Sequence, residues 1–268
     1  MKACLGGREF EWGDRVYVMG VVNVTPDSFS GDGLAHDPAA AVDLGLRMVA
    51  DGADILDVGG ESTRPGHRPV DAAEESKRVL PVVEQLAARA GVPISIDMTK
   101  PDVAAAAAGA GAAIVNDIWG LKRAPALAQI AARHRMGLVV MHNQDGTRYT
   151  DLVAEVVAGL ETAVRQAVAA GVPRERVIVD PGIGFGKTWE QNLVLLRRLE
   201  ELRAIGQPLL VGSSRKSFLG RLLDLPVGER EEGTAATVAA AVLRGADIVR
   251  VHDVRTMARV ARVAAALR

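Results

Sequence analysis

The amino-acid sequence predicts a single α/β domain over residues 1–268, folded as a closed (β/α)8 barrel of the TIM type. Three observations support this prediction. Eight short apolar segments rich in β-branched residues recur along the chain, segments with helical spacing lie between them, and a helix–glycine–strand unit occurs five times. None of the eight segments alternates cleanly with polar residues, which is typical of strands that are buried on both faces.

The predicted strands are, in chain order, Val16–Asn23, Asp54–Val58, Pro93–Asp97, Ala113–Asn116, Gly137–Met141, Arg176–Asp180, Pro208–Gly212 and Asp247–Val251. The clearest helical spacing lies over Pro38–Ala50, Val70–Ala90 and Leu152–Ala170. In the repeated unit, a glycine suits the left-handed residue just past a helix end. An open doubly wound sheet would use the same units, but eight strands in one domain of this length favour a closed barrel.

The composition narrows the classes of partner. Hydrophobic residues make up 49% of the chain, charged residues 24%, and the formal net charge is -1, so nothing indicates binding to nucleic acid or to an anionic membrane. The apolar stretch Val103–Val115 is too short to span a bilayer. A single cysteine, Cys4, excludes an intramolecular disulfide. Together with an N-terminus that has no apolar signal segment, it favours a reducing, cytoplasmic location.

Polar side chains follow nearly every predicted strand at its carboxyl end, where barrel enzymes carry their working residues. They are Asn23, Glu61–Arg64, Asp97, Asn116, His142, Asp180, Ser213–Ser217, Arg250 and His252. Each also has a simpler interpretation: an Asp at a strand end often caps the next helix, and a lone His or Lys is often structural or solvated. Their convergence on one rim indicates a site, because stability alone does not require it.

A cationic group is predicted at the last two strands. The segment Gly212–Ser217 opens a helix, where free backbone N–H groups and the helix dipole favour an anion. Arg250 and His252 alternate on the final strand and therefore face the same way. Lys216, Arg250 and His252 thus form a cluster suited to a phosphorylated substrate.

A second group contains acceptors and an amide. Asp97, Asn116 and Asp180 end the third, fourth and sixth predicted strands. A carboxylate facing an amidine-like edge accepts two parallel hydrogen bonds, so a guanidine-bearing heterocycle would suit this group. The residues therefore predict a barrel that binds an anionic compound with a polar heterocyclic end.

The glycine-rich segment Gly182–Thr188 (GIGFGKT) is not a nucleotide-binding loop. Pro181 stands where G-x-x-x-x-G-K-T requires its first glycine, and the spacing G-x-G-x-x-G is also absent. We expect instead a flexible loop between the sixth strand and its helix, with Phe185 offered as an apolar face.

Seven segments of the chain resemble the dihydropteroate synthase family, in family order. They are MGVVNVTPDSFS, ADILDVGGESTRPG, SIDMTKP, NDIWG, DPGIGFGKTWEQN, GSSRKSFLG and RVHDV, and they extend from about Tyr17 to Val254. The resemblance implies a transferase of folate biosynthesis that condenses 6-hydroxymethyl-7,8-dihydropterin pyrophosphate with p-aminobenzoate. The products would be 7,8-dihydropteroate and pyrophosphate. It also implies Mg²⁺ as cofactor and a homodimer.

The resemblance further implies roles for single residues. The pyrophosphate would be bound by Asn23, which also holds Mg²⁺, and by Thr63, Arg64, Arg250 and His252. The pterin would be bound by Asp97, Asn116, Met141, Asp180 and Lys216. The p-aminobenzoate would be bound by Thr63, Arg64, Phe185 and Ser217. The catalytic residues would be Asn23, Asp32, Lys216, Arg250 and His252, beneath the closing loops Thr25–Gly33 and Ser62–Arg68.

In the implied reaction the aryl amine, neutral at pH 7, displaces pyrophosphate from the exocyclic methylene carbon of the pterin. The departing charge is the difficult part, and Mg²⁺, Arg250 and His252 would neutralise it. Asp32 would stabilise the cation-like carbon, although the first loop reads SFSGDG where the family more often has SFSDGG. Met98 and the segment MHNQ also depart from the usual family pattern.

Other functions remain open at this point. A catalytically silent paralogue would only bind pterins, but both loop signatures are retained. A methyltetrahydrofolate-dependent methyltransferase domain has a similar fold and pterin pocket, but it does not need a pyrophosphate cluster. A sugar-phosphate aldolase would use Lys216 in a Schiff base, yet such lysines usually lie inside a strand, and Lys216 is four residues past Gly212.

Overall fold

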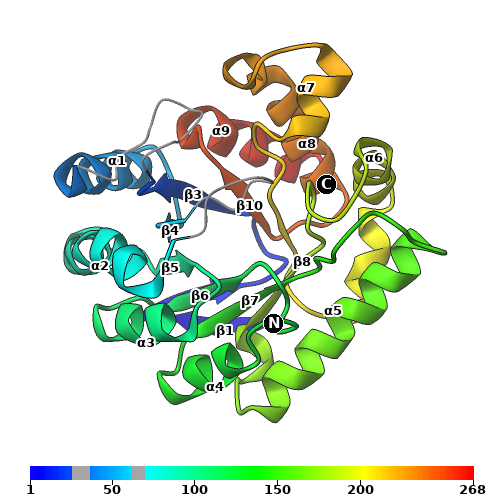
Figure 1. The fold of residues 1–268 in the computed structure, drawn as a ribbon. Helices are drawn as coiled ribbons and strands as arrows, with labels where there is room; N and C mark the ends of the chain where they lie inside the picture. Colours follow the sequence, from blue (N-terminus) through cyan, green and yellow to red (C-terminus); the bar gives the residue numbers. More distant parts are fainter. Residues whose placement is uncertain (26–36, 62–69) are drawn as a thin grey trace.

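The computed structural model describes residues 1–25, 37–61 and 70–268, and its centre is an eight-stranded parallel sheet rolled into a barrel (Figure 1). The strands are β3 (Tyr17–Asn23), β4 (Ile55–Gly59), β5 (Ile94–Asp97), β6 (Ile114–Asp117), β7 (Gly137–Met141), β8 (Val177–Asp180), β9 (Leu210–Val211) and β10 (Ile248–Val251). They pair in the order β8-β7-β6-β5-β4-β3-β10-β9. All eight predicted strands and the predicted TIM barrel are confirmed.

The two outer strands of this order, β8 and β9, meet and close the barrel. Val179 of β8 forms a parallel bridge with Leu209, just before β9, and its backbone N–H donates to the Pro208 carbonyl at 2.9 Å. Closure of a parallel sheet brings the carboxyl ends of all its strands to one rim.

Helices connect the strands and cover the outside of the barrel (Figure 1). They are α1 (Pro38–Ala50), α2 (Ala72–Arg89), α3 (Pro101–Gly109), α4 (Ala126–Arg133), α5 (Leu152–Ala169), α6 (Trp189–Arg197), α7 (Ser217–Leu223), α8 (Glu231–Leu243) and α9 (Val254–Ala266). Short 3-10 segments are η1 (Arg174–Arg176), η2 (Leu199–Ile205) and η3 (Val227–Glu229). Helices α1, α2, α5 and α9 begin after an aspartate whose side chain accepts from the backbone N–H three residues on, which fixes where each helix starts.

The inward face of the strands changes character along the barrel. Alternate side chains face inward, and the first inward positions are apolar: Tyr17, Met19, Ile55, Ile114, Val139, Ile178, Leu210 and Ile248 belong to one buried cluster. Two residues further along the same strands stand Asp57, Asn116, Asp180 and Arg250. The barrel is therefore closed by apolar packing in its first half and is polar toward its carboxyl-end rim.

A hairpin that the sequence analysis did not predict closes the opposite end. It consists of β1 (Lys2–Leu5) and β2 (Arg8–Glu11), paired antiparallel. Phe10 is fully buried, and its ring centroid lies 4.8 Å from that of Tyr17 and 5.2 Å from that of Trp12. These rings join the inward apolar cluster of the barrel, so the hairpin acts as a plug at the amino-terminal end of the strands.

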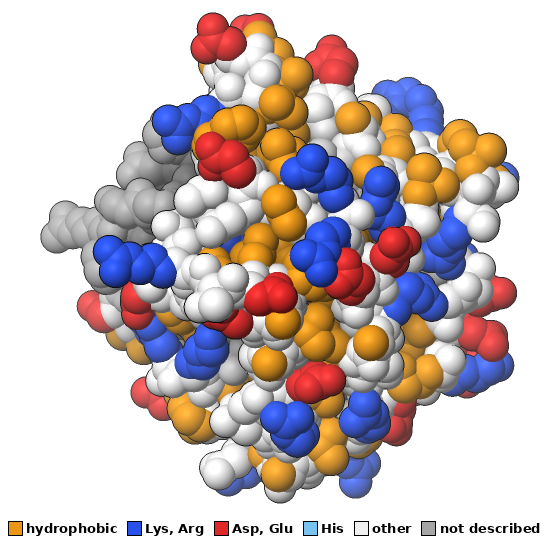
Figure 2. Space-filling view, turned by 90° about the vertical axis from the view of Figure 1, so that its right-hand side faces the viewer, with side chains coloured by type: hydrophobic (Ala, Val, Ile, Leu, Met, Phe, Trp, Pro, Cys, Tyr) orange, Lys and Arg blue, Asp and Glu red, His pale blue; other side chains and the backbone are white. Residues whose placement is uncertain are grey.

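The described surface agrees with the near-neutral composition. In the face shown in Figure 2, basic and acidic side chains are intermingled with apolar ones. No helix in the described ranges is long and apolar enough to cross a membrane.

Candidate active site

Arg250 joins the two groups of side chains that the sequence analysis treated separately. It projects inward from β10, and its Nε donates to Asp57 Oδ2 at 2.6 Å while its Nη2 donates to Asp97 Oδ2 at 2.8 Å. The cationic group and the carboxylate–amide group therefore share one cavity inside the rim. Asp97 does not cap α3, since that helix begins after Lys100 without a side-chain cap.

Asp57 is a central residue that the sequence analysis missed. It lies in β4 with no exposed surface, and its Oδ2 accepts from Arg250 and also from Asn116 Nδ2, at 3.0 Å. This one oxygen therefore bonds Arg250 of the predicted cationic group and Asn116 of the predicted carboxylate–amide group. The available signal was a charged residue inside an apolar strand segment (ILDV), two positions beyond the inward-facing Ile55.

Asp180 and Lys216 form the neighbouring part of the cavity. Asp180 is buried at the end of β8, and its Oδ1 accepts from the Gly182 backbone N–H at 2.7 Å. Burial raises the pKa of Asp180, and the nearby Lys216 opposes that rise. Burial has the opposite effect on a cation, and it lowers the pKa of Lys216 to about 8. The ammonium group of Lys216 donates to the Ile183 carbonyl and lies 4.4 Å from the centroid of the Phe185 ring.

The cavity contains carboxylates and cations together. Three carboxylates, from Asp57, Asp97 and Asp180, lie with two cations, Arg250 and Lys216. Burial, opposed by Arg250 and reinforced by Asp57, raises the pKa of Asp97 to about 7. Oδ1 of both Asp57 and Asp97 is buried without a hydrogen-bond partner among the described residues. Such oxygens are costly unless a donor reaches them, so the site suits a ligand with N–H donors.

His252 follows β10 and is oriented by Ser214. The Ser214 hydroxyl oxygen accepts from the His252 backbone N–H at 3.3 Å and lies 2.9 Å from His252 Nδ1. A Ser214 hydroxyl that donates to Nδ1 leaves the proton of a neutral His252 imidazole on Nε2. Arg215, which follows Ser214 in the chain, donates from its Nε to Glu231 Oε1 at 2.8 Å.

The loop between β8 and α6, which the sequence analysis expects to be flexible, is bound by several side chains. The ammonium group of Lys187, which is buried, donates to the carbonyls of Phe185 at 2.9 Å and Gly182 at 3.1 Å. Asn192 Oδ1 accepts from the Gly184 N–H at 2.6 Å. Because the lysine binds carbonyls of its own loop, it is turned away from any role as a phosphate-binding lysine, which agrees with the rejection of a Walker A loop.

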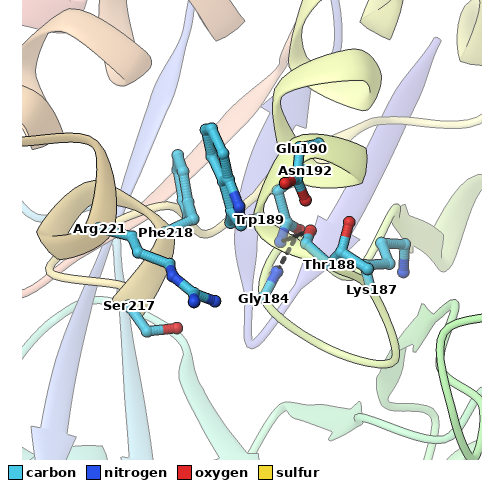
Figure 3. A pocket seen from close by; sticks show the side chains of 9 residues that line it. All are labelled: Gly184, Lys187, Thr188, Trp189, Glu190, Asn192, Ser217, Phe218 and Arg221. Atoms are coloured by element: carbon cyan, nitrogen blue, oxygen red, sulfur yellow. Dashed lines mark hydrogen bonds between the residues drawn. The ribbon is translucent and has the colours of Figure 1, made fainter.

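A pocket of about 470 Å³ opens between this loop and α7 (Figure 3). On one side lie Gly184, Thr188 and Trp189, and on the other lie Ser217 and Arg221 of α7. Ser217 is therefore close to the loop that carries Phe185, as the predicted p-aminobenzoate site requires.

The remaining predicted residues are placed as follows. Asn23 ends β3 at the rim and is partly exposed, and Met141 ends β7, where it is buried and pairs in register with Asp180. Asp32, Thr63 and Arg64 lie outside the described residues, as do most of the two predicted closing loops.

The comparisons with known proteins agree with this geometry. Residues 19–252 match the family model described as pterin binding enzyme. The dihydropteroate synthase of Bacillus subtilis (strain 168) is 48% identical over 250 residues, covering 93% of this chain and 88% of that protein. The chain belongs to the dihydropteroate synthase family. Solved structures of this family superpose on nearly the whole chain.

Solved structures with bound small molecules also resemble this chain. The dihydropteroate synthase of Xanthomonas albilineans with 4-aminobenzoic acid has a TM-score of 0.93 and 42% identity, covering 99% of this chain and 97% of that one. The enzyme of Thermus thermophilus in complex with 6HMPPP has a TM-score of 0.88 and 44% identity, with full coverage of both chains.

Proposed function

We propose that this chain is a dihydropteroate synthase, which condenses 6-hydroxymethyl-7,8-dihydropterin pyrophosphate with p-aminobenzoate to give 7,8-dihydropteroate and pyrophosphate. The observation that carries the proposal is the double ion pair of Arg250 with Asp57 and Asp97. It puts a cation suited to pyrophosphate and carboxylates suited to a pterin into one cavity. Membership of the family gives independent support.

In the proposed binding mode, the pterin lies in the barrel mouth. The Asp180 carboxylate accepts hydrogen bonds from its amidine-like edge, while Asp97, Asn116, Met141 and Lys216 complete the pocket. The pyrophosphate reaches Arg250 and the Nε2 proton of His252, which Ser214 orients. Thr63 and Arg64 would also contact it. The arylamine lies against Phe185 with its carboxylate toward Ser217, on the side of the loop that carries Gly184.

The reaction forms a bond between the arylamine nitrogen and the exocyclic methylene carbon, and breaks the carbon–oxygen bond to pyrophosphate. The electron pair leaves with the pyrophosphate oxygen, and the nitrogen releases a proton to solvent. Arg250 and His252 stabilise the departing charge by fixed hydrogen bonds. Asp32 would stabilise positive charge on the carbon.

Magnesium fits this site only as an ion carried largely by the substrate. The described residues contain no group of three or more His, Cys, Asp or Glu that could hold a metal. Mg²⁺ commonly keeps several waters and binds one or two protein oxygens together with substrate phosphates. Asn23 would supply an amide oxygen, and the ion would neutralise pyrophosphate charge. We further propose a homodimer in the cytoplasm, to be tested by light scattering and by fractionation of cells.

The test is release of pyrophosphate by the purified chain with Mg²⁺, dihydropterin pyrophosphate and p-aminobenzoate. We expect turnover that requires all three, and competition between a sulfonamide and p-aminobenzoate. Pterin binding with pyrophosphate release at the uncatalysed rate would identify a silent paralogue. Methyl transfer from methyltetrahydrofolate to a corrinoid would identify the methyltransferase instead.

A further inference from the structure

Lys187 is a buried lysine to which the proposed reaction gives no role. Its Nζ lies within hydrogen-bond distance of four acceptors: the carbonyls of Phe185 (2.9 Å), Gly182 (3.1 Å) and His142 (3.3 Å), and His142 Nδ1 (3.3 Å). An ammonium group has three protons and no acceptor capacity. All of its N–H donors are therefore engaged in bonds to this loop and to His142, the residue that follows β7.

The backbone of the loop that Lys187 binds does not fix this shape by itself. Gly182, Gly184 and Gly186 all have positive φ, at 71°, 85° and 55°, and glycine imposes little conformational preference of its own. Two further side chains support the loop: Asn192 accepts from the Gly184 N–H at 2.6 Å, and the Tyr149 hydroxyl donates to the Gly186 carbonyl at 2.8 Å. Figure 3 shows Gly184, Lys187 and Asn192 together at this turn.

The same loop holds Lys216. The Ile183 carbonyl accepts from Lys216 Nζ, and the Phe185 ring lies 4.4 Å from that nitrogen. A Cβ atom added at Gly184 would lie 2.7 Å from Lys216 Cδ, so the lysine side chain runs directly over the loop backbone. A small displacement of the loop would therefore move both the Phe185 ring and the ammonium group of Lys216.

We infer that Lys187 is a positioning residue for the arylamine side of the site. Its ammonium group fixes the β8–α6 loop so that the Phe185 ring and the Ile183 carbonyl hold Lys216 in place. This inference rests on the proposed function, which places the arylamine against Phe185. Lys187 itself does not touch the reacting atoms.

The expected effect of Lys187→Met is larger for one substrate than for the other. Methionine keeps an unbranched chain but donates no hydrogen bond. We expect the KM for p-aminobenzoate to rise about tenfold or more, in keeping with the loss of buried charge-assisted hydrogen bonds. The Kd for the pterin substrate should rise less, because Phe185 belongs to the loop itself, whereas the pterin pocket is linked to the loop only through Lys216 and the Gly182–Asp180 hydrogen bond.

Two comparisons separate positioning from a general loss of structure. Lys122→Met removes another rim lysine, which donates to the Asn143 carbonyl at 2.7 Å, and should leave both constants within about twofold. In a double-mutant cycle, Lys187→Met should add little to the KM effect of Phe185→Leu if it acts through that ring. Additive effects of the two changes, or equal effects on both substrates, would overturn the inference.

A second variant covers the case in which Lys187→Met does not fold. Tyr149→Phe removes one supporting hydrogen bond from the same loop at a half-buried position, and should raise the KM for p-aminobenzoate in the same direction but less. An unchanged KM in this variant would then count against the loop as the positioning element. Wild-type protein without turnover would refute the proposed function, whereas turnover that is insensitive to these changes would refute only the inference.

Discussion

The Asp57 carboxylate has no exposed surface, and one of its oxygens accepts from both Arg250 and Asn116. In the proposed binding mode, Arg250 binds the pyrophosphate and Asn116 binds the pterin. A single buried anion therefore positions a side chain for each half of the substrate. A change at Asp57 should not separate the two halves, although the sequence alone suggested two independent groups.

We predict that Asp57→Asn weakens the binding of inorganic pyrophosphate and of a free dihydropterin together. Asparagine keeps an oxygen for both donors but removes the charge that pairs with Arg250. Hydrogen bonds to charged groups contribute roughly 1.5–3 kcal/mol, so each Kd should rise on the order of tenfold or more. Titration calorimetry with each ligand measures this directly.

Ser95 provides the matched control for this change. It pairs in register with Asp57 on the neighbouring strand, is equally buried, and its hydroxyl has no hydrogen-bond partner among the described residues. Ser95→Ala should therefore leave both affinities within about twofold. An Asp57→Asn variant that lost affinity for only one ligand would show that the two halves are positioned separately.

At this scale the sequence predicts most of the described site but not its connections. Asp97, Asn116, Asp180, Lys216, Arg250 and His252 follow from their places at strand ends and from the family resemblance. The hydrogen bonds that join them depend on side-chain conformations across strands far apart in the chain, such as Asp57 and Arg250. Periodicity gives the direction of a side chain, not its partner.

Among the elements, the β8–α6 loop has contacts that its composition does not predict. Its composition, with three glycines between Asp180 and Lys187, is typical of a flexible segment. Its conformation is set instead by Lys187 and by bonds to residues after β7, including the Tyr149 hydroxyl. Contacts of this kind are long-range, so local sequence patterns do not contain them.

We predict that Gly182→Ala disrupts this loop and the activity with it. Gly182 has φ 71°, and an added Cβ would collide with the His142 carbonyl oxygen. Since that carbonyl belongs to the backbone, the loop must move away, and turnover should fall by at least about tenfold because Phe185 and Lys216 move with it. Steady-state kinetics, with circular dichroism as a check of folding, tests this.

Gly146→Ala separates the collision from the backbone conformation. Gly146 also has positive φ, at 81°, but nothing lies within 4 Å of an added Cβ. This variant should lose only about 1–2 kcal/mol of stability for the left-handed backbone and keep its turnover. Equal losses in the two variants would show that backbone strain, and not the contact with His142, is responsible.

The hairpin β1–β2 was missed although its turn carried a signal. Gly6 and Gly7 have positive φ, at 56° and 79°, as a two-residue hairpin turn of type I′ requires. The flanking segments, Lys2–Leu5 and Arg8–Glu11, are only four residues each, and the second has three charged residues, so neither predicts a strand by itself.

For the molecule as a whole, the closed barrel separates stability from chemistry. Apolar side chains fill its amino-terminal half, and the hairpin covers that end with Phe10 and Trp12. The polar residues of the site lie at the opposite rim. The eight strand segments predict this division, because a closed parallel barrel has only one carboxyl-end rim.

We predict that Phe10→Ala lowers the free energy of unfolding by about 3–5 kcal/mol, the usual cost of removing a fully buried aromatic ring. Turnover well below the melting temperature should stay within about twofold, because the plug and the site lie at opposite ends. Urea unfolding and steady-state kinetics measure the two quantities. Val263→Ala, at a position 62% exposed on α9, should change the free energy of unfolding by no more than about 0.5 kcal/mol. Its turnover should stay unchanged.

The exposed thiol of Cys4 lies on the hairpin, and it is the single cysteine of the chain. A maleimide dye or a solid support would therefore attach at one position, beyond the floor of the barrel. Protein immobilised in this way would present its mouth to the solution in one orientation. Affinity for substrates and inhibitors could then be measured on a uniform surface without altering a single residue.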